Sequence, residues 1–180
     1  MKLLLHVCCG PCLIYPLEFL KEKSFSIECF FYNPNIHPYA EYDKRLNTFK
    51  DLIKQYRLTA HFYQYDYENF FRRVSFNEHK PERCVICWRL RLTRTAEFAK
   101  ENNFEFFSTT LLSSPYQDQQ ALKRIGEDIA KDYTLNFGYF DMRAGFKKAH
   151  EEAKKTNLYC QNYCGCVYSQ VERYQKVGTK

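Results

Sequence analysis

The sequence predicts an α/β protein with a mostly parallel β-sheet and helices on both faces of that sheet. Short apolar runs alternate with longer amphipathic segments along the whole chain, and motifs rich in polar and cysteine residues directly follow the runs. Such alternation is typical of parallel strands that are joined by helices. The chain of 180 residues is 45% hydrophobic and has no repeats or Gly/Ser-rich linkers, so we expect a single domain spanning residues 1–180.

The first third of the chain predicts two strands and two helices. KLLLHV at residues 2–7 has the composition of a buried strand, and a helix is expected from Pro11 to Lys23. SIECFFYN predicts a second strand, and NPNIHP after it is rich in turn-forming residues. A helix is expected from Tyr39 to Tyr56, with a polar face formed by Glu41, Lys44, Arg45 and Lys50.

The rest of the chain continues the alternation. TAHFYQYDY predicts a third strand, and a short helix follows at residues 69–75. Residues 84–101 predict a long helix with apolar positions at Leu90, Phe98 and Ala99. FEFFSTTLL and LNFGYFD predict the fourth and fifth strands, separated by a helix at residues 117–132. The last two expected helices cover residues 147–155 and 169–176.

Chemically distinctive segments follow four of the predicted strands. HVCCGPC follows the first strand, NPNIHP the second and TTLLSSPYQD the fourth, while Asp141 and Arg143 follow the fifth. The carboxyl ends of parallel strands share one edge of a sheet, where α/β proteins gather their sites. We therefore expect these segments to face one crevice.

Cysteine usage is the main indication of function. The apolar run Leu3–Leu5 is shorter than the ~7–15 residues of a signal peptide, and no stretch approaches a membrane span, so we expect a cytoplasmic, reducing location without membrane contact. Cysteines at short spacings there favour metal binding or catalysis over disulfides. The nine cysteines are Cys8, Cys9, Cys12, Cys29, Cys84, Cys87, Cys160, Cys164 and Cys166.

Two pairs lie in the second half of the chain. Cys84 and Cys87 share one face of the expected helix start, where the helix dipole favours the thiolate. Cys164 and Cys166 flank a flexible glycine. Both pairs therefore suit metal ligation.

The first group differs because Cys8 and Cys9 are adjacent. Neighbouring side chains diverge in extended backbone, so we expect these two thiols to serve different centres. Cys12 follows Pro11 at a predicted helix start and is expected to turn back toward Cys8 or Cys9.

Counting the thiols constrains the cofactor. Cys29 lies in an apolar strand and is expected to be a core residue, and Cys160 is ambiguous. Seven thiols remain. Structural zinc and a [4Fe–4S] cluster each need four, which leaves about three for a second centre, and the spacing favours neither metal.

The charge of the chain points to a polyanionic partner. The net charge is +6, and residues 79–94 and 143–180, which hold the second and third cysteine groups, are basic. A basic field around a reactive site suits RNA, although a solvated surface would look similar. Neither a G-x-x-x-x-G-K-[ST] loop nor G-x-G-x-x-G occurs.

Six segments resemble, in order, the signature blocks of the QueH family of epoxyqueuosine reductases. They are HVCCGPC, FFYNPNIHPYAEYDKR, RCVICWRLRL, FSTTLLSSPYQD, FDMRAG and YCQNYCGCVYS, from about residue 4 to residue 169. The resemblance implies an adenine nucleotide alpha hydrolase-like fold (HUP or Rossmann-like) and cobalamin-independent reduction of epoxyqueuosine to queuosine in the tRNA anticodon. It also implies a [4Fe–4S] cluster beside a mononuclear iron, which zinc can replace on isolation.

The resemblance also implies ligands. Cys12 stands where members of the family have cysteine or aspartate, and Cys160 stands where we expect arginine, so a basic substrate contact is missing there. The implied metal ligands are Cys8, Cys9, Cys12, Cys84, Cys87, Cys164 and Cys166.

The implied reaction removes the oxygen of an oxirane, so we expect an open iron to bind that oxygen. The candidates for catalysis are Cys8, Cys12, Asp118 and Asp141, the aspartates as proton donors or as residues that orient a basic group. The candidates for substrate binding are Arg83, Arg89, Arg91, Arg94, Thr109, Thr110, Tyr116 and Arg143. The expected partners are the tRNA and an unidentified low-potential electron donor. The alternatives are a zinc-stabilised tRNA-binding module and an iron–sulfur electron carrier without epoxide chemistry.

Overall fold

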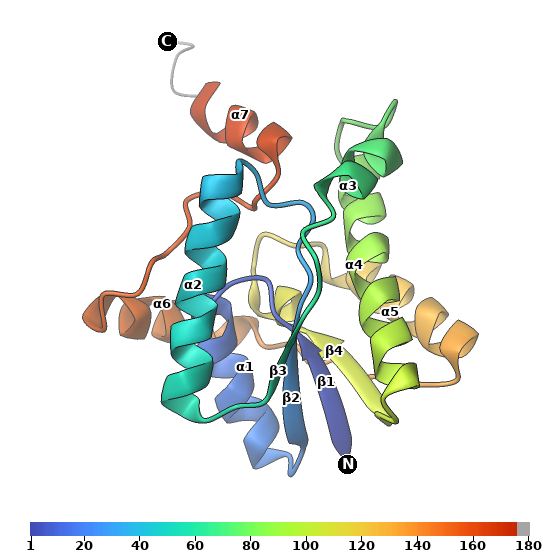
Figure 1. Ribbon diagram of the computed structural model, residues 1–180, viewed down its shortest axis with the longest axis vertical. Coiled ribbons are helices and arrows are strands. Elements are labelled where there is room, and N and C mark those ends of the chain that lie inside the picture. The colour runs from blue at the N-terminus through green and yellow to red at the C-terminus, as the bar shows by residue number, and fades with distance from the viewer. Residues whose placement is uncertain (176–180) are drawn as a thin grey trace.

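The computed structural model, described here over residues 1–175, is built on a central sheet (Figure 1). The sheet has five strands. All neighbouring strands are parallel, in the order β3-β2-β1-β4-β5. The predicted α/β class is therefore confirmed. The strands are β1 (Lys2–His6), β2 (Ser26–Phe31), β3 (Ala60–Phe62), β4 (Phe106–Thr109) and β5 (Asn136–Phe137).

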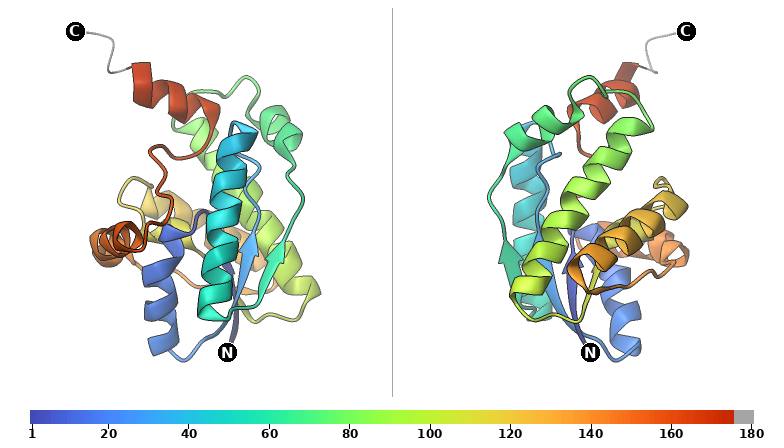
Figure 2. Two further views of the ribbon diagram at one scale, coloured as in Figure 1. Left: turned by 60° about the vertical axis from the view of Figure 1, so that its left-hand side comes forward. Right: turned by 90° about the vertical axis from the view of Figure 1, so that its right-hand side faces the viewer.

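Helices cover both faces of the sheet, as the sequence predicts (Figure 2). The α-helices are α1 (Pro11–Glu22), α2 (Tyr39–Tyr56), α3 (Tyr67–Val74), α4 (Glu82–Glu101), α5 (Gln119–Tyr133), α6 (Phe146–Lys155) and α7 (Val167–Gln175). Two short 3₁₀ helices, η1 (Thr110–Ser113) and η2 (Arg143–Gly145), join them. None of the helices in residues 1–175 has the length and apolar character needed to cross a membrane.

The sheet packs between two apolar layers because successive side chains of a strand point to opposite faces. Leu4 and Phe107 face a core completed by α4 and α5. Leu3, Leu5 and Phe31 face a core completed by α1 and α2. All five side chains are 0% exposed, and burying each contributes about 1.5–3 kcal/mol.

The strand order reverses between β1 and β4. The chain builds β2 and β3 on one side of β1 and then crosses to place β4 on the other side, with His6 paired to Thr109 at the carboxyl end. A crevice forms where the loops after two such strands separate. The loop with Cys8 and Cys9 and the loop with Thr110 therefore meet at this switch point.

Some element bounds differ from the prediction. The third and fifth strands are shorter than expected, because the segments that follow Phe62 and Phe137 leave the ladder. The fourth strand ends at Thr109, whose hydroxyl accepts a hydrogen bond from the Leu111 amide and starts η1. The last helix begins at Val167, earlier than expected, and its predicted end at Lys176 lies outside the described residues.

Candidate metal centre at the switch point

Three thiols converge directly after β1. The sulfurs of Cys8, Cys9 and Cys12 all lie within 4.8 Å of one another, and Cys9 and Cys12 are joined as a disulfide. The Cys12 amide, in the first turn of α1, donates to the Cys9 sulfur at 3.3 Å. A helix start stabilises negative charge, so these thiols, once reduced, lie where thiolates are favoured. We call Cys8, Cys9 and Cys12 the β1 thiol group.

The expected divergence of Cys8 and Cys9 is wrong. Their sulfurs lie 3.9 Å apart. The strand ends at His6, and the backbone bends before α1 begins, so the alternation of extended chain does not apply. The expectation that Cys12 turns back toward its neighbours is confirmed.

Two threonines at the end of β4 support this loop. The Thr110 hydroxyl accepts from the Cys8 amide at 3.1 Å and donates to the Cys8 sulfur at 3.3 Å. The Thr109 hydroxyl pairs with the ring of His6 at 2.9 Å. Burial lowers the pKa of His6 well below its usual value, and the nearby Arg91 lowers it further. Both threonines are 0% exposed, so Thr110 contacts a candidate ligand rather than an open substrate surface.

A second group of thiols joins α4 to the segment before α7. Cys84 and Cys87 lie in the first turns of α4, and Cys87 packs with Cys166 in a small apolar cluster. Burial raises the pKa of Cys84, and the neighbouring thiols of Cys164 and Cys166 raise it further. Burial raises the pKa of Cys87 to about 12, with Arg91 opposing the effect. We call Cys84, Cys87, Cys164 and Cys166 the α4–α7 thiol group.

The backbone around Cys164 is held in place by α2. The Arg45 guanidinium, which is buried and paired with Glu41 at 2.7 Å, donates to the carbonyls of Tyr163 and Cys164. Gly165 has a φ of +145°, and a Cβ there would lie 3.1 Å from the Asn35 amide. Glycine therefore allows the two thiols on either side of it to reach the α4 start.

Two glutamines contact the candidate ligands, and the sequence analysis missed both. Gln161 donates its side-chain amide to Cys9 at 3.0 Å and to Cys12 at 3.5 Å. The Gln117 amide lies 3.8 Å from the Cys164 sulfur, while its oxygen accepts from the Trp88 indole at 2.9 Å. Both lie inside the quoted motifs, but glutamine has no ligand spacing that would have singled them out.

The donor set of both groups is sulfur alone. Tetrahedral thiolate coordination at about 2.3 Å places neighbouring sulfurs about 3.8 Å apart, close to the spacing of Cys8 and Cys9. Thiolate donors select zinc or iron–sulfur groups over hard cations. The residues therefore fit an iron–sulfur cofactor, provided that the disulfide between Cys9 and Cys12 is first reduced.

A family model described as epoxyqueuosine reductase QueH matches residues 3–172. The chain belongs to the QueH family. It is 37% identical over 177 residues to the epoxyqueuosine reductase QueH of Dehalococcoides mccartyi, covering 97% of this chain and 96% of that one. It is 34% identical over 181 residues to the QueH of Thermotoga maritima, covering 96% and 92%.

A solved structure supports the fold. This is a predicted tRNA methyltransferase subunit from Methanocaldococcus jannaschii, matched with a TM-score of 0.56 and 10% identity over 86% of this chain and 74% of that one. At this identity the likeness supports only the predicted Rossmann-like architecture.

Two of the predicted surface arginines are buried, which corrects the prediction for Arg83 and Arg91. Each is 2% exposed. Together with Cys87 they share the inward face of α4 at intervals of four residues, so neither faces solvent. Arg83 pairs with Glu172 at 2.7 Å. Arg91 donates to the side-chain oxygen of Asn33 at 2.9 Å and lies 3.8 Å from the Cys87 sulfur, where its charge lowers the pKa of Cys87 against the effect of burial.

The other predicted arginines are partly exposed. Arg89 lies 3.9 Å from Asp128, Arg94 pairs with Glu97 at 2.7 Å, and the guanidinium of Arg143 binds the Asp141 carboxylate at 2.8 and 2.6 Å. The hydrogen bonds from Arg143 lower the pKa of Asp141 to about 2. Asp141 therefore orients Arg143, which is one of its two predicted roles, and is ionised at neutral pH.

The remaining predicted residues occupy different environments. Asp118 caps α5 by accepting from the Ala121 amide at 2.9 Å. Tyr116 is 83% exposed and meets the edge of the Phe146 ring. Cys29 is fully buried, as expected, and burial raises its pKa to about 12. Cys160 packs beside Ile14 and α6, and its sulfur lies 3.6 Å from the Leu158 carbonyl.

Proposed function

We propose that this protein reduces epoxyqueuosine to queuosine in a tRNA anticodon, without cobalamin, through a [4Fe–4S] cluster and an adjacent mononuclear iron. Family membership supplies the reaction. The observation that carries the cofactor proposal is the gathering of Cys8, Cys9 and Cys12 at the switch point, where their sulfurs lie within 4.8 Å of one another. The four thiols of the α4–α7 thiol group lie near enough for Cys164 and Cys166 to raise the pKa of Cys84. We propose a cytoplasmic location, where thiols stay reduced.

The grouping suggests how the thiols divide. The α4–α7 thiol group has the four sulfurs that a [4Fe–4S] cluster needs. The β1 thiol group has three, which would leave a single iron one open position. When bound, these groups would supply electrons one at a time and a Lewis acid for the epoxide oxygen.

The protein side chains would prepare the site for this chemistry. Thr110 fixes Cys8, while Gln161 orients Cys9 and Cys12 and Gln117 lies beside Cys164. Hydrogen bonds to ligand sulfurs stabilise their negative charge and adjust the reduction potential of the bound group.

The overall reaction sets the remaining requirements. Converting the epoxide to an alkene consumes two electrons and two protons and releases one water. The electrons would come from an unidentified low-potential donor. Asp118 stays a predicted proton donor, whereas Asp141, with a pKa of about 2, is better suited to holding Arg143 toward the tRNA.

The tRNA would reach the thiols past the exposed residues near them. Tyr116 directly precedes Gln117, and an exposed tyrosine is a platform on which a base can stack. Arg89, Arg94 and Arg143 would contact phosphates, whose binding falls with salt.

Iron and sulfide quantification on anaerobically purified protein tests the cofactor. The proposal predicts iron in excess of sulfide, because a single iron accompanies the cluster. Stoichiometric zinc without sulfide would favour a zinc-stabilised tRNA-binding module, and iron–sulfur protein without turnover would favour an electron carrier.

A further inference from the structure

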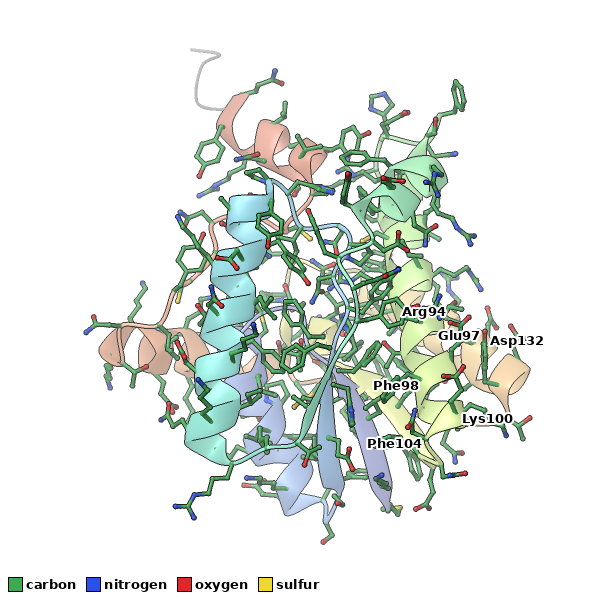
Figure 3. The ribbon with its side chains drawn as sticks, in the orientation of Figure 1. Arg94, Glu97, Phe98, Lys100, Phe104 and Asp132 are labelled. Carbon is green, nitrogen blue, oxygen red and sulfur yellow. A yellow bond between two sulfur atoms is a disulfide. The ribbon has the colours of Figure 1, made fainter. Side chains whose placement is uncertain are left out.

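A pocket separate from the thiol groups lies between α3 and α4. Its volume is about 300 Å³, at the lower end of small-molecule sites. None of the cysteines lines it, although Ile86 and Leu90 of its lining also pack against the small cluster that holds Cys87. Arg94 and Glu97, one turn apart along α4, belong to the lining (Figure 3).

The pocket contains a buried hydroxyl without a partner. Tyr32, which follows β2, lines the pocket, yet its side chain is only 1% exposed. Its hydroxyl forms no hydrogen bond of normal geometry with the part of the chain that the structure describes, although Asn69 lies close enough to lower its pKa. An unpaired buried polar group costs free energy, so this hydroxyl is available to a ligand that enters the pocket.

The polar lining is mostly composed of hydrogen-bond donors and is positively charged. Arg73 comes from α3 and Arg89 and Arg94 come from α4, against the single carboxylate of Glu97. Arg73 contacts the side-chain oxygen of Asn69 at 3.5 Å rather than a carboxylate of the described residues. The Asn69 side chain also lies beside the Tyr32 hydroxyl, whose pKa it lowers. Several donors and an excess of guanidinium suit a phosphate group.

The pocket also has an apolar wall. Ile86 and Leu90 lie on the lining face of α4. The Arg94 guanidinium lies over the Tyr63 ring, 4.7 Å from its centre, which fixes its orientation. A nucleotide would contact both parts of the lining. Its flat base would pack against the apolar wall, and its phosphate would bind the arginines.

We propose that the α3–α4 pocket is a subsite for one nucleotide of the RNA substrate, with its phosphate held by Arg73 and Arg94 and by the Tyr32 hydroxyl. This inference rests on the proposed function, because it takes the ligand from the tRNA. The nucleotide would lie outside the thiol groups, on the same helix that carries Cys84 and Cys87. The subsite would therefore position the strand without taking part in the chemistry.

Binding of an unmodified anticodon-arm RNA hairpin to the anaerobically purified full chain tests this proposal. Tyr32→Phe removes only the hydroxyl, and Arg73→Gln removes one guanidinium. Each is expected to weaken hairpin binding about tenfold, the loss typical of a charge-assisted hydrogen bond. Arg72→Gln is the matched control, because Arg72 is exposed on the same helix, pairs with Glu68 and does not line the pocket. It is expected to change binding by less than about twofold.

Three outcomes would overturn the proposal. Equal losses of hairpin affinity for Arg72→Gln and Arg73→Gln would mean that the RNA is attracted by the overall positive charge and not by the pocket. Unchanged binding by Tyr32→Phe would mean that its hydroxyl does not face the RNA. Adenosine monophosphate that binds the wild type but not Tyr32→Phe, with hairpin affinity unchanged, would assign the pocket to a free nucleotide. These comparisons measure binding alone, so failure of epoxide reduction would count against the proposed function and leave the subsite test intact.

Discussion

The side-chain amide of Gln161 lies 3.0 Å from the sulfur of Cys9, although the two residues are separated by 152 positions in the chain. This contact ties the segment before α7 to the loop after β1. The side-chain oxygen of Gln161 is buried and has no partner among residues 1–175. Gln161 therefore serves the thiols through its amide hydrogens, and we expect it to be a positioning residue.

Gln161→Glu is expected to reduce the iron content of the β1 thiol group. The change keeps the shape of the side chain, but it removes the amide donor and places a carboxylate beside thiolates. Loss of such a supporting contact typically costs ~10–100-fold in metal affinity. The measurement is iron bound per chain during anaerobic reconstitution at limiting iron. Gln55→Glu, at an exposed position on α2, is the control, and equal iron binding by both variants would contradict the role.

Thr110→Val is expected to destabilise the metal-free protein by about 1–3 kcal/mol. Valine has nearly the same shape but leaves the Cys8 amide without its acceptor. Urea unfolding measures the loss. The control is Thr156→Val, which removes a similar hydroxyl at an exposed position after α6. If Thr156→Val lowered the free energy of unfolding as much as Thr110→Val, the Thr110 hydroxyl would have no special role in stability.

The stability of the protein is expected to depend on His37 between pH 6.5 and about 4. Burial lowers the pKa of His37 to about 4, so folding holds it neutral while the unfolded chain takes up a proton below its usual pKa of 6.5. The stability that the neutral His37 contributes is complete above pH 6.5. As the pH falls toward 4 this contribution is lost, and the free energy of unfolding decreases by at most about 3 kcal/mol.

Unfolding of the wild type and of His37→Gln across this pH range tests the prediction. The variant is expected to show a flatter dependence, with a remaining slope from His6, whose pKa burial also lowers. Parallel curves for the two proteins would show that His37 does not control this dependence.

The cysteines are expected to differ in how fast they react with an alkylating reagent, because their thiols differ in exposure. In reduced, metal-free protein at pH 8, iodoacetamide should modify the exposed Cys164 quickly and the buried Cys29, with a pKa of about 12, only on unfolding. Peptide mass analysis over time measures each rate. Modification of Cys29 as fast as that of Cys164 would contradict its placement in the core.

The alternation of strands and helices was sufficient to predict the fold class, because both carry strong local patterns. The segments after the strands were correctly expected to gather, as the contact between Cys8 and Thr110 shows. Strand lengths were less predictable. Apolar residues continue past the fourth strand to Leu111 and Leu112, and the end of the strand at Thr109 depends on a side-chain cap that hydrophobicity does not reveal.

The site could be predicted where residue type and spacing carry the chemistry. Cys84 and Cys87 both lie in the first turns of α4, as their spacing predicted. The prediction that the Cys8 and Cys9 side chains diverge was wrong, because it assumed an extended backbone. The burial of Arg91 could not be foreseen from charge, because its partners Asn33 and Cys87 lie on different elements.

Single-turnover conversion of epoxyqueuosine-containing tRNA by iron-loaded protein with a strong reductant tests the central claim most directly. The proposed function predicts queuosine formation by the wild type and by Cys29→Ala, and none by Cys8→Ala or Cys166→Ala. Unchanged epoxyqueuosine with fully loaded wild-type protein, or an equal loss of activity in Cys29→Ala, would contradict the proposed function and its assignment of the thiols.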